Sequence, residues 1–320
     1  MRAVVTGGAG FVGSHMVDRL LEDGWDVTVF DNMSTGSISN LSNSLGSDRL
    51  KVERAEIRDQ KAVMDALLGQ DVVFHFAATQ DFRNSLRDHQ IDFENNIWGT
   101  LNLLEAAYRN DVPHFIFAQT TALYGENDGS LMPESFVGVQ TNLYGATKLA
   151  AGALAEAYTQ FSPMKLWTFR FGRVLGAREK KGAIWDFISK LKRDPTRLEI
   201  LGNGKQSRQY VHVSDIVDGI LFGYSRSRES VNVFNLSTEE TVTIEQLTDV
   251  VLETLRLEKI PRIYTSDEPR GYVGDNPKVH LSIEKMKALG WAPKRTARDA
   301  IVENTVWAAR TQNWPGAIRE

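Results

Sequence analysis

The chain of 320 residues contains no cysteine. Disulfide bonds, thiolate nucleophiles and metal sites built on cysteine are therefore excluded. Its six histidines show no metal-ligand spacing such as H-x-x-x-H. We therefore expect a protein that binds no metal.

Long basic runs and long apolar runs are also missing. The formal net charge is −4, which argues against nucleic acid or an acidic membrane surface as a partner. No stretch approaches the roughly 18 consecutive apolar residues that a membrane span needs. The first strand is expected to start at Arg2, which leaves no room for a signal peptide. These features predict a cytoplasmic protein, and a hydrophobic content of 42% suffices for one large or two modest domains.

Short apolar runs alternate with amphipathic stretches through the first half of the chain. Near-continuous apolar strands separated by helices are typical of a parallel sheet that is covered on both faces. The pattern predicts a Rossmann-type, doubly wound α/β fold. Strands are expected at 2–7, 25–31, 71–77, 114–120 and 165–176, and helices at 10–24, 60–69, 93–111 and 142–161.

The alternation of apolar strands with amphipathic helices changes after about residue 176. Helices are expected at 182–194, 243–255 and 282–290, the second of them with Thr243 as its N-cap. Between them, residues 198–224 read as a strand, a turn, a strand and a helix, and 230–237 as a strand. We expect two domains, the second a smaller C-terminal α/β region that binds substrate. The first comprises 1–175 with about 208–238, and the second comprises 176–207 and 239–320.

The first expected strand runs into the glycine-rich stretch "TGGAGFVG". Gly7, Gly10 and Gly13 let backbone amides at a helix N-terminus approach a pyrophosphate. Asp31 ends the second expected strand, 18 residues after Gly13, and suits the adenosine ribose hydroxyls. Asn32 follows rather than an arginine, which favours NAD over NADP. The alternative is a turn that serves only close packing of strand and helix.

The stretch "TNLYGATKLAAG" places Tyr144 and Lys148 one helical turn apart. Such side chains share a helix face, and an ammonium lowers the pKa of a neighbouring phenol. The pair is either a proton-transfer catalyst or an ordinary surface contact.

Together these motifs make the chain resemble an extended short-chain dehydrogenase/reductase of the NAD-dependent nucleotide-sugar epimerase/dehydratase branch, with echoes of archaeal-type UDP-glucose 4-epimerases. The matching stretches follow one another in family order: "TGGAGFVGSH", "FHFAAT", "DFENNIWGTLNLLEAA", "TTALYG", "YGATK", "FRFGRVLGA" and "ALGWAPK". They cover almost the whole chain.

The resemblance implies roles for particular residues. Tyr144 and Lys148 match the catalytic Y-x-x-x-K and Thr120 the catalytic Ser/Thr, with Thr121 as its replacement if the loop register differs. Bringing a phenol from its usual pKa to near 7 takes about 4 kcal/mol, which Lys148 and an oxidised nicotinamide are expected to supply. The implied cofactor-binding residues are Gly7, Gly10, Phe11, Val12, Gly13, Asp31, Asn32, Glu56, Ile57, Phe76, Ala77, Ala78, Asn96, Tyr144, Lys148 and Phe171.

Substrate contacts are implied at Gln80, Thr121, Arg173, Arg208 and Arg270. Arginines suit a diphosphate because they donate bidentate hydrogen bonds, although each could also be an exposed loop residue. Arg173 stands where the family usually has asparagine, and we expect it to influence the choice of sugar.

The resemblance predicts an NAD-dependent nucleotide-sugar 4-epimerase for UDP-glucose/UDP-galactose or a related UDP-sugar. The family's 4,6-dehydratases carry Asp-Glu after the threonine, and its decarboxylases a glutamate two residues after it. Here Thr121 and Ala122 stand at those places. The alternatives are a dehydratase or another sugar-modifying enzyme of the family, and a non-enzymatic NAD-binding regulator. The family also implies a homodimer formed through helices 93–109 and 143–160.

Overall fold

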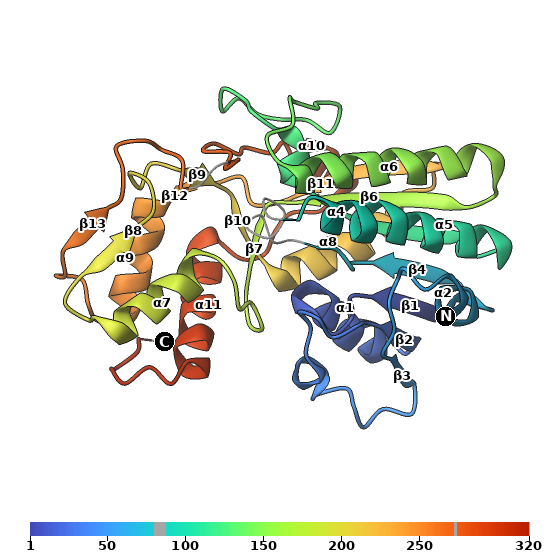
Figure 1. Ribbon diagram of the computed structural model, residues 1–320, viewed down its shortest axis with the longest axis horizontal. Helices are drawn as coiled ribbons and strands as arrows, with labels where there is room; N and C mark the ends of the chain where they lie inside the picture. Colours follow the sequence, from blue (N-terminus) through green and yellow to red (C-terminus); the bar gives the residue numbers. More distant parts are fainter. Residues whose placement is uncertain (80–87, 272–273, 320) are drawn as a thin grey trace. The chain divides into compact units, whose positions relative to one another are not determined.

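The computed structural model describes residues 1–79, 88–271 and 274–319. The chain forms two compact units and passes between them several times (Figure 1). The first unit comprises Met1–Gly125, Val137–Phe171 and Ile220–Phe234, and the second comprises Glu126–Phe136, Gly172–Gly219 and Asn235–Glu320.

A seven-stranded sheet with the order β11-β6-β5-β4-β1-β2-β3 organises the first unit. Strands β1 to β6 pair in parallel. The strand order reverses between β1 and β4, as in the doubly wound α/β fold that the sequence predicts. The strands are β1 (Arg2–Thr6), β2 (Asp26–Phe30), β3 (Leu50–Glu53), β4 (Val72–His75), β5 (His114–Thr120), β6 (Lys165–Phe171) and β11 (Val231–Leu236).

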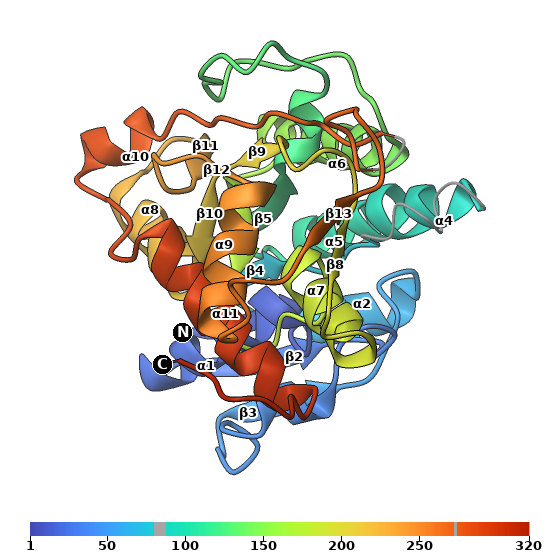
Figure 2. The ribbon, with the colours of Figure 1, turned by 90° about the vertical axis from the view of Figure 1, so that its left-hand side faces the viewer.

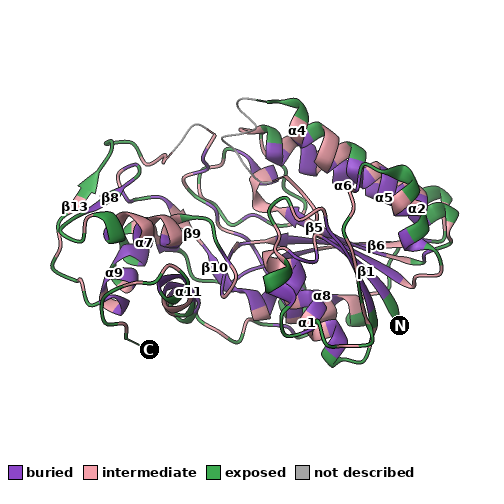
Figure 3. Cartoon of the chain, turned by 60° about the horizontal axis from the view of Figure 1, so that its bottom comes forward, coloured by how far each residue is buried: buried purple, intermediate pink, exposed green. Residues whose placement is uncertain are grey.

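Helices cover both faces of this sheet. In Figure 3, α2 (Gln60–Leu67), α5 (Gly99–Arg109) and α6 (Leu143–Phe161) lie over one face, and α1 (Phe11–Glu22) lies over the other. Apolar side chains of α2, α5 and α6 pack on the sheet in one core, because their buried faces follow the helical period. Short turns of helix complete the unit: η1 (Ile38–Leu41), α4 (Gln90–Asp92), η2 (Phe93–Trp98) and η3 (Thr121–Tyr124).

The second unit has its own core, and it also contains short pairs of strands. Its core residues include Phe187, Leu247 and Ile301, and Figure 2 shows α7, α9 and α11 of this unit near one another. Its strand pairs are β7 (Arg173–Leu175) with β10 (Tyr210–His212), β9 (Ser207–Arg208) with β12 (Val242–Thr243), and β8 (Leu198–Ile200) with β13 (Arg262–Tyr264). Its helices are α7 (Ala183–Arg193), α9 (Ile244–Thr254), α10 (Glu284–Leu289) and α11 (Ala297–Thr311), while α8 (Val213–Arg226) begins in this unit and ends in the first.

Several predicted boundaries need correction. The predicted helix 93–111 begins with a π-helical segment, η2, before it becomes the α-helix α5. The predicted strand 165–176 is interrupted at Gly172, and its two parts, β6 and β7, belong to different sheets. Strand β3 was not predicted, and neither was α11.

The sequence of helix α11 shows no clear apolar periodicity, because small and polar residues form most of its buried face. Asn304 and Thr305 are among them. Its start does carry a local signal, a capping box between Thr296 and Asp299. The predicted N-cap Thr243 of α9 is confirmed, and it forms a capping box with Gln246. Across the described residues, no helix is both long and apolar enough to span a bilayer.

Candidate active site

The predicted cofactor and catalytic residues of the first unit gather at one edge of the seven-stranded sheet. The carboxyl ends of parallel strands meet at such an edge, and a crevice opens where the strand order reverses. Here that point lies between β1, which leads into Gly7, and β4, which leads into Phe76. Thr120 ends β5 and is the register partner of Phe171, the last residue of β6.

The glycine turn after β1 leaves no room for side chains. Gly7 has φ +68°, and a Cβ there would lie 2.7 Å from the backbone nitrogen of Ala77. A Cβ at Gly13 would lie 2.2 Å from the Gly7 carbonyl oxygen. Gly10 is the N-cap of α1, and its side-chain-free backbone leaves the first amides of that helix accessible. The turn therefore has the bare backbone and helix N-terminus that a pyrophosphate requires.

Asp31 follows β2 and is tied to this turn. Its carboxylate accepts hydrogen bonds from the backbone N–H of Ala9 at 2.9 Å and of Met33 at 2.8 Å. The side chain is buried, which fixes its position beside the glycine turn. Each carboxylate oxygen retains a further lone pair for a ribose hydroxyl.

Asn96 connects two predicted parts of the site. Its Oδ1 accepts from the Thr79 N–H at 2.9 Å, just beyond Phe76–Ala78, and its Nδ2 donates to Thr147 Oγ1 at 3.1 Å on α6. Asn96 is buried, so its amide serves as a bridge between elements rather than a surface group. Gln80, predicted to contact substrate, lies outside the described residues.

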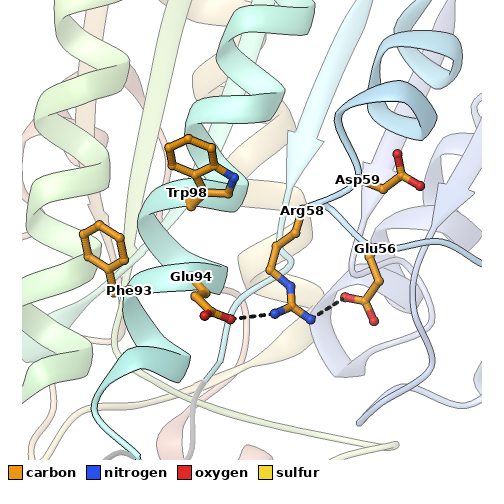
Figure 4. Close-up of a pocket in the computed structure, with 6 residues that line it drawn as sticks. All are labelled: Glu56, Arg58, Asp59, Phe93, Glu94 and Trp98. Atoms are coloured by element: carbon orange, nitrogen blue, oxygen red, sulfur yellow. Dashed lines mark hydrogen bonds and ion pairs between the residues drawn. The ribbon is translucent and has the colours of Figure 1, made fainter.

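Glu56 lines a surface pocket of about 580 Å³ together with Arg58, Asp59, Phe93, Glu94 and Trp98. Figure 4 shows the Arg58 guanidinium between the carboxylates of Glu94, at 2.7 Å, and Glu56, at 3.5 Å. Glu56 also accepts from the Asn32 amide at 3.2 Å, so these two predicted residues lie together. Ile57 is buried instead, and the absence of a Cβ at Gly99 makes space for its side chain.

Tyr144 and Lys148 lie in the first turns of α6, where Asn142 caps the helix by accepting from the Gly145 N–H at 2.8 Å. Both side chains are buried, which rules out the ordinary surface contact that the sequence left open. The Tyr144 phenol shares a side-chain hydrogen bond with Thr120. The Lys148 Nζ lies 4.0 Å from the centroid of the Phe117 ring. The structure therefore brings together the three predicted catalytic residues.

Burial dominates the acid–base properties of this group. Desolvation raises the pKa of Tyr144 to about 12, the Thr120 hydrogen bond lowers it and the Asp92 carboxylate raises it. Desolvation lowers the pKa of Lys148 to about 7. The sequence predicted a phenol acidified by Lys148 together with an oxidised nicotinamide. In the protein alone the pKa of Tyr144 shifts the other way, because burial penalises a phenolate.

A series of buried hydrogen bonds through Gln119, Arg170 and Tyr124 lies next to the backbone of Lys148, and the sequence did not predict it. Gln119 donates to the Lys148 carbonyl at 3.0 Å and accepts from the Arg170 Nε at 2.9 Å. Arg170 also donates to the Tyr124 hydroxyl at 3.1 Å. An arginine inside the apolar strand "KLWTFRF" was the available signal, because a buried guanidinium needs partners.

The predicted substrate arginines all lie in the second unit, and each has a carboxylate partner there. Arg208 pairs with Asp275, Arg270 with Glu126, and the Arg173 guanidinium lies 3.6 Å from Glu179. Arg270 also donates to the Asp275 carbonyl at 3.0 Å, so Arg208 and Arg270 converge on one residue.

Arg173 also makes contacts with the segment that follows it in the sequence. It donates to the Lys181 carbonyl at 3.2 Å, and a Cβ at Gly182 would lie 2.2 Å from its Nη2. The segment 176–182 therefore closes around this guanidinium. Thr121, the other residue predicted to contact substrate, starts η3 in the first unit beside Thr120.

Comparisons with known proteins define the class. The sequence profile of the NAD-dependent epimerase/dehydratase family matches residues 3–237. A putative UDP-glucose 4-epimerase of Methanocaldococcus jannaschii is 30% identical over 95% of this chain and 97% of its own length. The chain belongs to the NAD-dependent epimerase/dehydratase family, as its sequence predicts.

Solved structures agree with this assignment. The UDP-glucose 4-epimerase of Thermotoga maritima with UDP-glucose superposes with a TM-score of 0.87 at 30% identity, covering 98% of this chain and 100% of that one. A double mutant of dTDP-glucose 4,6-dehydratase from Streptomyces venezuelae, with NAD bound, superposes with a TM-score of 0.90 at 26% identity, covering 98% of each chain. Both reactions therefore occur on this fold.

The lowered pKa of Lys148 predicts a pH-dependent stability. Its folded value of about 7 lies below the ordinary 10.5, so the unfolded chain binds more protons between these values. The free energy of unfolding should therefore rise with pH in this window, by about 1.4 kcal/mol per pH unit for this one group. Urea unfolding from about pH 7.5 to about pH 9.5, below tyrosine ionisation, measures it.

Lys148→Met removes the titrating group and keeps a long side chain. The stability advantage of the variant over the parent chain should shrink by about that amount for each pH unit. Parallel pH curves for the two proteins would contradict a desolvated lysine at this position.

Proposed function

We propose that this protein is an NAD-dependent nucleotide-sugar 4-epimerase that interconverts UDP-glucose and UDP-galactose or a related UDP-sugar pair through a transient 4-keto sugar. The observation that carries the proposal is the buried group in which the Tyr144 phenol is hydrogen-bonded to Thr120 and lies one turn before Lys148. It stands at the sheet edge that also holds the glycine turn. All three groups needed for proton transfer are present, which supports an enzyme over a non-catalytic NAD-binding regulator. Membership of the epimerase/dehydratase family supports the same choice.

The residues around the glycine turn fit NAD. The bare backbone of the glycine turn and the N-terminus of α1 suit a pyrophosphate, and Asp31 suits the adenosine ribose while disfavouring a 2′-phosphate. Asn32, Glu56 and Ile57 would lie toward adenine, and Phe76, Ala77, Ala78 and Phe171 would line the rest of the site. When bound, NAD would supply a reversible hydride acceptor for the sugar C4 and the positive charge of its oxidised ring.

Tyr144 acts as the general base that removes the proton of the sugar C4 hydroxyl. In the protein alone burial keeps its pKa at about 12, so the phenol is protonated at neutral pH and needs positive charge nearby to become a base. The Lys148 ammonium, whose pKa of about 7 lets it exist in both forms near neutrality, contributes to that charge. The Thr120 hydroxyl holds the phenol oxygen in place and orients the sugar hydroxyl.

Epimerisation is favoured over the family's other reactions by the turn that follows Thr120. A dehydratase must remove the C5 proton and expel the C6 hydroxyl, and this requires further acid and base groups beside the reacting sugar. Residues Thr121 and Ala122 at the start of η3 carry no carboxylate, and Tyr124 in the same turn is bonded to Arg170. Returning the hydride to the opposite face of a 4-keto sugar needs no additional acid.

The arginines of the second unit supply the anchor for a nucleoside diphosphate. Arg208 and Arg270 converge on Asp275, and both guanidinium groups are only partly buried. Paired guanidinium groups suit two adjacent phosphates, which would take the place of carboxylate contacts. Arg173, which is held by Glu179 and Lys181, adds positive charge that we propose favours one sugar over another.

We also propose a homodimer formed through η2, α5 and α6. Large apolar side chains on these elements are exposed, with Trp98 44% and Phe161 60% accessible. The Phe161 ring lies 5.8 Å from the Tyr108 ring between centroids, so two of these exposed aromatic side chains pack together at the C-terminal ends of α5 and α6. Burying such a patch against its symmetry mate is the usual solution for soluble enzymes.

The sugar reaction is tested by incubating the NAD-loaded protein with UDP-, GDP-, CDP- and dTDP-sugars in deuterated water. We expect a UDP-sugar to yield its C4 epimer with unchanged mass, because hydride and proton transfers at C4 place no solvent deuterium on carbon. Deuterium on the carbon skeleton together with loss of water would show a dehydratase instead. Loss of carbon dioxide from a UDP-uronate would show a decarboxylase.

The two neighbouring threonines form a matched pair for mutagenesis. Thr120→Val removes the hydroxyl that bonds Tyr144, and we expect kcat to fall about 10²-fold, in the range of a lost general acid–base partner. Thr121→Val should change kcat by less than about twofold, as expected of a substitution that spares the reacting groups. A larger loss at Thr121 would assign the role to that threonine, and equal losses in the two variants would contradict a role that belongs to Thr120 alone.

The homodimer is tested by sedimentation velocity. Phe161→Glu should shift the protein from dimer to monomer, because it places a charge within the proposed contact, at the C-terminal end of α6. The control is Leu68→Glu, which changes a side chain that is 72% exposed at the end of α2. A parent chain that sediments as a monomer, or a Phe161→Glu variant that stays dimeric, would overturn the proposal.

A further inference from the structure

A chain of buried hydrogen bonds centred on His75 runs through the first unit and has no part in the proton transfer described above. His75 ends β4, and its ring lies between the hydroxyls of Thr6, which ends β1, and Thr100 on α5. The Nδ1 atom is 2.7 Å from Thr6 Oγ1, and the Nε2 atom is 2.9 Å from Thr100 Oγ1. All three side chains are fully buried.

The donor and the acceptor of each hydrogen bond in this series follow from the hydroxyl group of Thr100. Thr100 donates its only hydroxyl proton to the Asn96 carbonyl at 2.6 Å, so its oxygen must accept from His75 Nε2. His75 therefore carries its proton on Nε2, and its Nδ1 accepts from the Thr6 hydroxyl. Thr6 Oγ1 in turn accepts from the Ala77 N–H at 3.3 Å.

The ring is neutral as well as oriented. Burial and the Lys148 ammonium hold the pKa of His75 well below its ordinary value. Its faces are packed by Phe117, stacked at 5.6 Å between centroids, and by Phe115, edge-on at 6.0 Å. Phe117 is also the ring beneath the Lys148 ammonium.

One end of the chain is fixed at the glycine turn. Thr6 directly precedes Gly7, and its carbonyl accepts from the Phe76 N–H at 3.0 Å. The backbone of Ala77 lies where a Cβ of Gly7 would be. The Thr6–His75 bond therefore clamps the end of β4 against the turn that is proposed to receive the pyrophosphate.

The other end is fixed near the catalytic helix. The Asn96 carbonyl, which Thr100 holds, belongs to η2, and π-helical segments frequently mark functional sites. The Asn96 amide reaches Thr147, whose hydroxyl donates to the Tyr144 carbonyl at 3.1 Å. Two sets of hydrogen bonds, joined through the covalent frame of Asn96, thus connect the glycine turn to the residue that carries the phenol.

We propose that His75 is a positioning residue, a neutral imidazole protonated on Nε2 that holds the glycine turn and the Asn96 segment of η2 at a fixed separation and so places Tyr144 relative to the cofactor cradle. The role in turnover rests on the proposed function, whereas the tautomer and the connection to cofactor binding do not. A histidine that only fills the core would need neither hydroxyl partner, and this difference is open to experiment.

The tautomer is tested first, by ¹⁵N NMR of protein labelled at histidine, with His75 assigned from the signal that disappears in His75→Gln. We expect a single neutral form with protonated Nε2 and unprotonated Nδ1, and no protonation as the pH falls to about 5.5, one unit below the ordinary histidine pKa. In Thr100→Val the preference for Nε2–H should weaken, whereas Thr100→Ser should retain it. An Nδ1–H form or a mixture of tautomers in the parent protein would overturn the assignment.

The positioning role is tested by removing one hydroxyl at a time. Thr6→Val should weaken NADH binding, followed by fluorescence, about tenfold, which corresponds to the loss of one buried hydrogen bond. Thr100→Val should instead lower kcat about tenfold with the KM of the UDP-sugar changed less than about twofold, because its end of the chain orients Tyr144. Thr6→Ser and Thr100→Ser should each restore the parent value to within about twofold, because the hydroxyl is retained.

These outcomes separate the two proposals. If serine variants are impaired as strongly as valine variants, the methyl groups matter and the hydrogen-bond chain does not, which overturns the role of His75. If the parent protein turns over no nucleotide sugar, the proposed reaction fails, while the tautomer and the NADH affinities still decide the role of His75. Circular dichroism of each variant shows whether a loss reflects misfolding, and in that case the serine variant provides the result.

Discussion

The hydrogen bond between Tyr144 and Thr120, formed where water is excluded, is the interaction on which the account depends. Burial pushes the pKa of the phenol up and that of the neighbouring Lys148 down, so the two groups differ by about five units. A phenol in this state holds its proton until positive charge arrives beside it. We propose that the phenol acts as a base only when its electrostatic environment changes.

The sheet provides the frame for this chemistry. Parallel strands bring the ends of β1, β2, β4, β5 and β6 to one edge. The glycine turn, Asp31 and Phe76 follow β1, β2 and β4 there, and Thr120 ends β5. Buried side-chain amides and hydroxyls connect these strand ends to neighbouring elements of the first unit. Asn96 joins the β4 end to α6, and Gln119 joins β5 to the backbone of Lys148. Such fully satisfied polar networks are costly to disturb, which suits a site that must hold its groups in register.

Local sequence patterns predicted much of the fold and of the candidate site. The glycine turn, Asp31 and the Tyr144/Lys148 spacing are short-range features, and so are the alternating strands and helices and the Thr243 cap. The features that the sequence did not predict share one cause, which is the tertiary environment of the residues. In the protein without bound NAD, burial raises the pKa of Tyr144, an effect that the sequence did not predict. The Arg170–Gln119 contact joins residues 51 positions apart. Helix α11 buries small and polar residues, and Gly172 separates strands of two different sheets.

The central claim is that the Tyr144 hydroxyl moves the proton of the sugar. Tyr144→Phe deletes that single oxygen, and its most direct measurement is the rate of UDP-sugar epimerisation together with NADH affinity. The account predicts a fall in kcat of about 10²- to 10⁴-fold with NADH binding nearly unchanged. A variant that interconverts its sugars at the parent rate would contradict it.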